Sequence, residues 1–324
     1  MGTLFVPIFL FGSVNDKREQ QMKKILSAVL VGLLLLNGCT KVKLTDLKVL
    51  TPAGAPAIAL IPLMIENSED EVVVVDGTDV ISAELVKGDY DAIVAPVNLG
   101  LTLASKGNSD YILYGVLTWG NLYVVAAEGS TLDQAGDMAL FGQAAVPQKI
   151  WNTVKSSLGS VRNEVYYNAV ADVQLQLLTK AMNIGLMAEP ALSATIAKAK
   201  TQGITLSIVA DVQESWKSVT GSDNYPQAGL FIKKDAESGV KNSVKARFVE
   251  IQEFLASMNS NPDSIVSSVE EVGAERLGIA SAAIIKTAWD RMNVEAVLAK
   301  DAQDEIQAFM DLFGMSDISE YIDK

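Results

Sequence analysis

The chain has 324 residues, of which 49% are hydrophobic, and its 26 Lys and Arg against 39 Asp and Glu give a formal net charge of −13. It contains no histidine and one cysteine, which excludes a Ser-His-Asp hydrolase, a histidine-based zinc site and a disulfide framework. A surface this acidic argues against binding to nucleic acid and against electrostatic binding to anionic lipid headgroups. Carboxylate chemistry remains open, but no close acidic pair in an apolar surround indicates acid–base catalysis.

The cysteine closes an apolar run near the start of the chain. Lys23 and Lys24 precede an apolar segment over 25–36, which is shorter than the roughly 20 residues that span a bilayer. A charged head, a short apolar middle and a small residue at the end are typical of a secretory signal. The run ends in Leu-Asn-Gly-Cys at 36–39, which resembles a lipoprotein lipobox and predicts lipidation of Cys39. The alternative is a buried free cysteine that ends a core helix.

Under this interpretation residues 1–38 are an upstream segment and a signal peptide, and the mature protein begins at Cys39. Residues 1–21 read as the product of an early start assignment, because Met22 begins a complete signal by itself. The remaining 286 residues carry 22 Lys and Arg against 37 Asp and Glu, a net charge of −15. We therefore expect membrane attachment through the acyl chains at Cys39 rather than through charge.

The first third of the mature chain alternates β-branched runs with helical patterns, which is typical of a layered α/β protein. In the helix that begins at Gly54, Pro56 lies in the first turn. Thr78 and Asn98 are expected to cap the two following helices, and Gly88 to end the helix that begins at Thr78. The sequence predicts strands over 47–52, 71–77 and 90–97, and helices over 54–65, 78–88 and 98–107.

The middle of the chain repeats this alternation, and the end is mainly helical. Two strand-like runs within 111–129 are broken at Trp119-Gly120-Asn121. From Val240 onward the patterns indicate helices, the last over 301–314 with Gly314 as its stop. Further strands are predicted over 138–146, 163–168, 184–190, 204–211 and 228–234, with helices around Trp151 and over 169–182 and 191–203.

This order of elements indicates two lobes, the second inserted into the first. We place lobe 1 at 41–119 and 236–324 and lobe 2 at 120–235, with hinges near 119–122 and 233–235. The predicted class is α/β, each lobe having a mixed sheet flanked by helices, with a cleft between the lobes.

Two stretches carry a resemblance to a known family. In ISAELVKGDYDAIVAPVNLG (81–100) a helix that ends in Gly leads to an Asp-containing strand and a loop, and in LTKAMNIGLMAEPALSATIAKAK (178–200) a strand ends in Glu-Pro before a helix. With the signal at Cys39, their order resembles the substrate-binding lipoproteins of ABC importers, which have the type 2 periplasmic-binding fold. The likeness is to the branch for nitrate, taurine, sulfonates and thiamine precursors.

The resemblance implies a monomeric protein, lipid-anchored at the extracytoplasmic face of the cell membrane, that binds a small-molecule solute by lobe closure. Its partners would be ABC permease subunits and their cytoplasmic ATPase, and no cofactor, metal or nucleic acid is expected. The family's enzyme relative, a suicidal pyrimidine synthase, relies on histidine. Because this chain contains no histidine, binding is favoured over catalysis. Anion-binding members often use arginine, but none of Arg162, Arg247, Arg276 and Arg291 is expected at the cleft.

Ligands of open α/β sheets bind beyond the carboxyl ends of the strands. We expect Trp119 to offer a flat apolar wall and Glu189 to pair with a cationic group of a ligand. Such a site suits a neutral or weakly charged organic solute, including cyclic and nitrogen- or sulfur-containing ones. The predicted ligand-binding residues are Gly54, Ala55, Thr78, Val97, Asn98, Trp119, Gly120 and Asn121 in lobe 1 and Gln143, Asn168 and Glu189 in lobe 2.

Each residue also has a structural interpretation. Trp119 fits equally well as a core aromatic, Asn98 and Asn168 as helix caps, and Glu189 as a cap of the following helix. Trp151 and Trp289 are expected to be packing residues. Two alternative functions remain: a surface lipoprotein of the same fold with an adhesion or signalling role and no transported ligand, and a lyase or isomerase that uses carboxylates.

Overall fold

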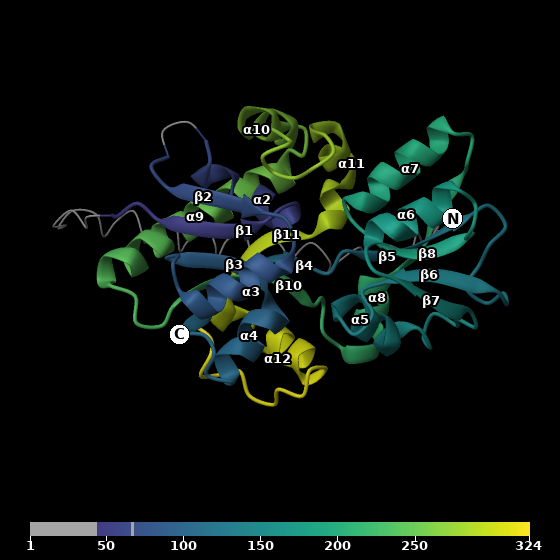
Figure 1. Ribbon diagram of the computed structural model, residues 1–324. Coiled ribbons are helices and arrows are strands. Elements are labelled where there is room, and N and C mark those ends of the chain that lie inside the picture. Colours follow the sequence, from purple (N-terminus) through teal and green to yellow (C-terminus); the bar gives the residue numbers. More distant parts are fainter. Residues whose placement is uncertain (1–43, 66–67) are drawn as a thin grey trace, which may run out of the picture. The chain divides into compact units, whose positions relative to one another are not determined.

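The computed structural model describes residues 44–65 and 68–324 (Figure 1). The predicted signal peptide and Cys39 lie outside these residues. The described chain forms two mixed β-sheets flanked by helices, which confirms the predicted α/β class. Among the described residues, none of the helices has the length and apolar character needed to cross a membrane.

Eleven strands and the helices between them are described. The strands are β1 (Lys48–Pro52), β2 (Glu71–Val75), β3 (Ala92–Pro96), β4 (Tyr111–Trp119), β5 (Leu122–Ala127), β6 (Asp137–Phe141), β7 (Asn163–Tyr167), β8 (Ile184–Ala188), β9 (Leu206–Asp211), β10 (Pro226–Lys233) and β11 (Val294–Leu298). The helices are α2 (Ala55–Ala59), η1 (Ile61–Leu63), α3 (Thr78–Lys87), α4 (Val97–Ser105), α5 (Val146–Val154), α6 (Val170–Leu178), α7 (Ala191–Thr201), α8 (Val212–Thr220), α9 (Ser238–Ser260), α10 (Ser264–Val272), α11 (Ala282–Met292), η2 (Ala299–Asp301) and α12 (Gln303–Asp311).

The first sheet has six strands in the order β11-β4-β10-β3-β1-β2. Strand β1 runs parallel to β2 and β3, whereas β10 runs antiparallel to both of its neighbours, β3 and β4. The second sheet has five strands in the order β7-β6-β8-β5-β9, in which β6 is parallel to β7 and β8 and β5 is antiparallel to β8 and β9. Both sheets are therefore mixed.

The first sheet takes strands from both ends of the described chain. Strand β10 pairs with β3 and β4, so residues 226–233 belong to the first sheet, although the predicted boundary at 235 placed them in lobe 2. The predicted hinge at 233–235 is corrected accordingly: the chain returns to the first sheet through the turn between α8 and β10. The hydrophobic pattern of 228–234 predicts a strand but not the sheet that it joins, because that depends on distant partners.

Apolar side chains cover both faces of the first sheet. Helices α3, α4 and α12 contribute to one hydrophobic cluster, and α2, α9, α10 and α11 to another. In the second sheet, α5 and α8 pack in the first of these clusters and α6 and α7 in a third. Trp151 and Trp289 are 0% and 3% exposed, which confirms them as packing residues.

Several element predictions are wrong in detail. The helix expected over 54–65 is divided into α2 and η1, because Pro62 has no N–H and its ring clashes with the preceding turn. Helix α8 and strand β11 were not predicted. The caps also differ: Gly77, Pro96 and Ala169 occupy the N-cap positions of α3, α4 and α6, so Thr78, Asn98 and Asn168 do not cap them. Gly88, with φ +82°, ends α3 as predicted.

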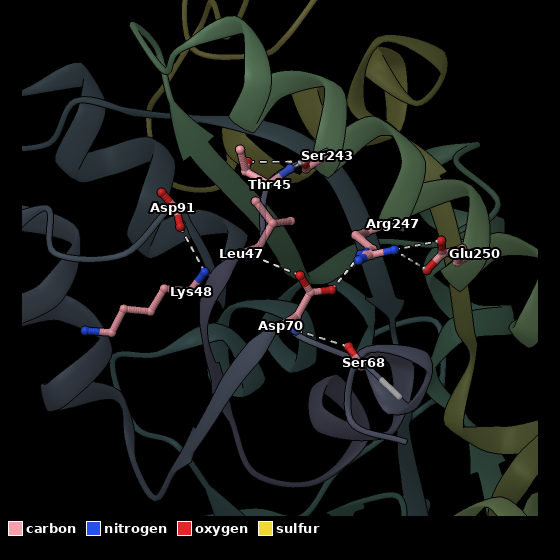
Figure 2. Close-up of polar contacts among 9 residues, drawn as sticks. All are labelled: Thr45, Leu47, Lys48, Ser68, Asp70, Asp91, Ser243, Arg247 and Glu250. Atoms are coloured by element: carbon pink, nitrogen blue, oxygen red, sulfur yellow. Dashed lines mark hydrogen bonds and ion pairs between the residues drawn. The ribbon is translucent and has the colours of Figure 1, made fainter. Parts of the chain in front are cut away.

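A polar cluster holds the beginning of β1 against α9 (Figure 2). The fully buried Asp70 carboxylate accepts hydrogen bonds from the Leu47 backbone N–H at 2.8 Å and from Arg247 Nε at 2.5 Å. Two residues before Leu47, the Thr45 N–H donates to Ser243 Oγ at 2.8 Å. These contacts fix the start of the described chain to the second and third turns of α9.

A second polar cluster surrounds Glu164 in the second sheet. Glu164 on β7 accepts from Trp151 Nε1 at 3.0 Å and Lys155 Nζ at 2.7 Å with one oxygen, and from Tyr166 Oη at 3.0 Å with the other. Burial acts to raise the pKa of Glu164, but these hydrogen bonds outweigh it and hold the pKa below its usual value.

We expect Glu164→Gln to reduce the acid sensitivity of the protein. A carboxyl whose pKa is lowered by folding stabilises the folded state above its unfolded pKa, and this contribution is lost as the pH falls through the folded pKa. Urea unfolding at pH 6 and pH 3.5 should therefore show a larger loss of stability in the wild type than in the variant, by up to about 1 kcal/mol. Equal losses would contradict the assignment.

Candidate ligand-binding site

The register of the first sheet brings eight predicted residues to one edge. Strands β1, β2 and β3 are parallel, and β4 has the same direction because β10 lies antiparallel between β3 and β4. The carboxyl ends of these four strands therefore lie along one edge. The residues that follow those ends are Gly54, Ala55, Thr78, Val97, Asn98, Gly120 and Asn121, and Trp119 is the last residue of β4.

The other three predicted ligand-binding residues follow the carboxyl ends of strands in the second sheet. Strands β6, β7 and β8 are parallel and end at Phe141, Tyr167 and Ala188. Gln143, Asn168 and Glu189 follow these ends and lie along one edge of this sheet.

The two edges meet where the chain crosses between the sheets. Strand β4 ends at Trp119, and β5 begins at Leu122, whose partner in the antiparallel pair is Ala188 at the end of β8. Only Gly120 and Asn121 separate the two strands. The carboxyl edges of both sheets are thus joined by a two-residue connection, at the position of the first predicted hinge.

Asn121 is buried within this crossover and forms hydrogen bonds with both ends of its side-chain amide. Its Nδ2 donates to the Glu189 carbonyl oxygen at 2.9 Å, and its Oδ1 accepts from Gln227 Nε2 at 2.9 Å. Its backbone carbonyl accepts from the Glu189 N–H at 3.1 Å. The side chain therefore ties the end of β8 to β10 of the first sheet.

Gly120 and Trp119 also form hydrogen bonds with other residues of this chain. The Gly120 N–H donates to the Tyr225 carbonyl at 2.9 Å and to Asn224 Oδ1 at 3.1 Å, and its carbonyl accepts from Asn293 Nδ2 at 2.5 Å. Trp119 is 7% exposed and donates from Nε1 to the Glu295 carbonyl at 3.1 Å. These contacts place the indole in the core, as the structural interpretation of Trp119 has it.

Glu189 directly precedes Pro190, the N-cap residue of α7, and is paired with a cation of this chain. Its Oε2 accepts from the Ser193 N–H at 3.0 Å, so it caps the start of the helix as the structural interpretation proposed. Its Oε1 accepts from Ser193 Oγ at 2.9 Å and Arg291 Nε at 2.7 Å. The carboxylate side chain is fully buried, and the side chain of Arg291 is 33% exposed.

Arg291 is the residue that the sequence interpretation missed, since it was set aside as remote from the expected cleft. It lies at the end of α11, beside the first sheet, and its Nη2 also donates to Ser193 Oγ at 2.8 Å. Its backbone carbonyl accepts from Tyr123 Oη of β5 at 3.1 Å, and burial raises the pKa of Tyr123, which keeps this hydroxyl protonated. No local sequence signal marks a contact between residues 102 positions apart.

The remaining predicted residues differ in exposure. Val97 is fully buried and Ala55 is 8% exposed, so they offer little side-chain surface to a ligand. Thr78, Gln143 and Asn168 are exposed and form no side-chain hydrogen bond with another described residue. The Oδ1 atom of Asn98 is buried and accepts no hydrogen bond from the described part of the chain. Asn98 thus carries a buried acceptor without a partner in the described part of the chain, at the edge of the first sheet.

The described residues include no group of three or more His, Cys, Asp or Glu side chains that could hold a metal ion.

No protein-family model matches the sequence, and no match was found among curated proteins. Solved structures do match. An ABC transporter protein from Parabacteroides distasonis is 22% identical, with a TM-score of 0.67 over 86% of this chain and 93% of that one. The periplasmic aliphatic sulphonate binding protein of Escherichia coli is 16% identical, with a TM-score of 0.64 over 87% and 93%.

A third match is the alkanesulfonate-binding protein of Xanthomonas axonopodis pv. citri bound to MOPS, which is 13% identical with a TM-score of 0.56 over 86% of this chain and 94% of that one. All three likenesses extend over most of both chains. The protein therefore has the two-sheet α/β fold of periplasmic solute-binding proteins.

Proposed function

We propose that this protein is the extracytoplasmic solute-binding component of an ABC importer, anchored through an acylated Cys39. The observation that carries the proposal is the meeting of both sheets' carboxyl edges at Gly120 and Asn121. A ligand held by loops of both edges would favour one arrangement of the two lobes, which is the state that a permease can recognise. The similar structures are transport proteins of this kind, which supports the proposal.

The chemistry of the edges supports a neutral or weakly charged organic solute. The buried negative charge of Glu189 is already balanced by Arg291, so a cationic ligand group has no unpaired carboxylate there. The buried carbonyl oxygen of Asn98 lacks a partner among the described residues, so a movement of the lobes that opened it would favour a solute with an N–H or O–H donor. Thr78, Gln143 and Asn168 supply further donors and acceptors from the two edges. Two of the similar structures bind sulfonates by name, so small sulfonates belong in the first test panel.

A thermal-shift panel tests the proposed function. A ligand that binds only the folded state raises the melting temperature according to its concentration over Kd. Small sulfonates, pyrimidines, polyamines and aromatic acids at millimolar concentration should include a class that gives a saturable increase. A flat response across all four classes would count against solute binding. Mass spectrometry of membrane-derived protein tests the anchor, since acylation at Cys39 adds a defined lipid mass.

We expect Asn98→Leu to separate binding from stability. The substitution removes the acceptor at similar volume, so solute affinity should fall about tenfold, as expected for a lost buried hydrogen bond. Stability without ligand should stay the same or rise by up to about 1 kcal/mol, because a buried oxygen without a partner is removed. Titration and urea unfolding measure the two effects. Asn152→Leu, at an exposed position on α5, serves as the control and should leave affinity unchanged.

One observation favours the alternative, a surface lipoprotein of the same fold with no transported ligand. Trp119, Asn121 and Glu189, which were expected to contact a solute, are engaged by groups of this chain itself. If the protein has no transported ligand, no solute class would shift the melting temperature, and Asn98→Leu would change only the stability. The panel therefore discriminates between the two functions.

A further inference from the structure

A surface hollow of about 260 Å³ lies on the first sheet, away from the candidate ligand-binding edge. Its floor includes Tyr114 of β4, five residues before Trp119 at the carboxyl end of that strand. At about 3.3 Å per residue, the hollow and the edge are roughly 16 Å apart along β4. The two sites can therefore be tested independently.

The hollow concentrates positive charge on an acidic protein. Lys241 and Lys245 reach it from the first two turns of α9, and Lys300 from η2. Leaving the last residue of the chain aside, one carboxylate, that of Asp323, lines the hollow with these three ammonium groups. None of the three lysines forms an ion pair with another residue in 44–65 or 68–324. The charge balance here is opposite to the chain's net charge of −13.

Two of these lysines repel each other. Lys241 and Lys245 are four residues apart on one helix face, where like charges destabilise a helix. A bound anion between them would relieve this repulsion. Lysine ammonium groups are compact point charges with three donors each, which bind phosphate oxygens in many proteins.

Neutral donors complete the site. The Asn242 amide and the Tyr114 hydroxyl line the hollow, and neither forms a side-chain hydrogen bond with another residue of the described part. Tyr114 is half-buried against Phe248, with ring centroids 5.2 Å apart. Burial and the Asp323 carboxylate raise the pKa of Tyr114 to about 12, so its O–H remains a donor at neutral pH.

We propose that this hollow is a binding site for a phosphate-type oxyanion, held by Lys241, Lys245 and Lys300 with Asn242 and Tyr114 as neutral donors. The anion has two possible sources, a free phosphate compound or the phosphate of an anionic lipid headgroup. The proposal departs from the expectation that the acidic net charge argues against binding to anionic headgroups, because a local cluster acts within a Debye length of about 8 Å.

The entry of the chain supports the lipid source, and this step rests on the proposed acylation of Cys39. The Thr45 N–H donates to Ser243, between Asn242 and Lys245 on α9. Thr45 follows Cys39 by six residues, which span at most about 20 Å when extended. An acylated Cys39 would therefore keep the lysines close to the headgroups.

The test uses the full chain with Cys39→Ser, which cannot be acylated, in two arms. One arm titrates inorganic pyrophosphate by calorimetry at 50 and 300 mM NaCl, and the other sediments the protein with phosphatidylcholine vesicles with or without 30% phosphatidylglycerol. We expect saturable binding in at least one arm, weakened about tenfold at the higher salt concentration. Lys241→Ala/Lys245→Ala should weaken it at least fivefold, and the matched pair Lys198→Ala/Lys200→Ala on α7 should not.

Binding to pyrophosphate alone assigns the free anion, and binding that depends on phosphatidylglycerol alone assigns the headgroup. No binding in either arm, or equal weakening by the control pair, overturns the proposal. The same double variant should keep the thermal response to solute. A flat thermal response of the wild type to every solute class, together with retained anion binding, would count against the proposed function and leave this site intact.

Discussion

Arg291→Met should destabilise the protein by about 3 kcal/mol in urea unfolding. The substitution keeps most of the aliphatic volume but leaves the fully buried carboxylate of Glu189 without its cation. Breaking a buried ion pair by removing one partner typically costs about 3 to 5 kcal/mol, and we take the lower end because the side chain of Arg291 is one-third exposed. The lost contact also joins α11, beside the first sheet, to α7 of the second.

The effect should be asymmetric between the two partners. Glu189→Gln keeps an acceptor for Ser193 and leaves a cation that water can reach, so we expect a loss of about 1 kcal/mol. The double variant Arg291→Met/Glu189→Gln should recover about half of the loss caused by Arg291→Met, because no buried charge remains. Arg276→Met is the matched control at an exposed arginine and should change stability by less than about 0.5 kcal/mol. Equal effects of Arg291→Met and the control would contradict this account.

Gly120→Ala should cost about 2 to 3 kcal/mol, which is the upper part of the range for overpacking. A Cβ atom at this position would lie 2.5 Å from the Tyr225 ring and 2.6 Å from Asn224 Oδ1. Tyr225 cannot yield easily, because it is fully buried between Trp216 and Phe309. The crossover must therefore shift, and thermal unfolding should show a clear decrease in the melting temperature.

Gly239→Ala provides the comparison for this variant. Its Cβ would meet Thr45 Cγ2 at 3.5 Å, an ordinary contact, and the residue lies in the first turn of α9. Alanine favours the helix, so the variant should be as stable as the wild type or up to about 1 kcal/mol more stable. If the Gly120→Ala protein were as stable as the Gly239→Ala protein, the crossover would be shown to tolerate a side chain.

Local sequence patterns predicted the helices and strands whose own residues favour that structure. The strand-helix alternation from 47 to 211 is visible in the sequence because β-branched runs and turn residues alternate there. Helix α8 also had a signal that was missed: Asp211 accepts hydrogen bonds from the N–H groups of Gln213 and Glu214, and Gly221 in the left-handed region ends the helix. An N-cap and a C-terminal glycine around an amphipathic run are typical of a short helix.

Long-range pairing could not be predicted in the same way. Strand β11, Val-Glu-Ala-Val-Leu, has only five residues after a helix, and it forms because the edge of β4 is available. The assignment of β10 to the first sheet and the pairing of Arg291 with Glu189 have the same origin. For the candidate site, the strand ends were predictable, whereas the burial of Asn121, Trp119 and Glu189 depends on partners more than 60 residues away.

The position of β10 between β3 and β4 has a consequence for the order in which the chain can fold during synthesis. Until residues 226–233 have emerged, β3 and β4 have no strand to join them, whereas every strand of the five-stranded sheet lies within 122–211. A nascent chain that stops before Pro226 can complete the inserted sheet but not the surrounding one. We therefore expect the last third of translation to decide when the native structure closes.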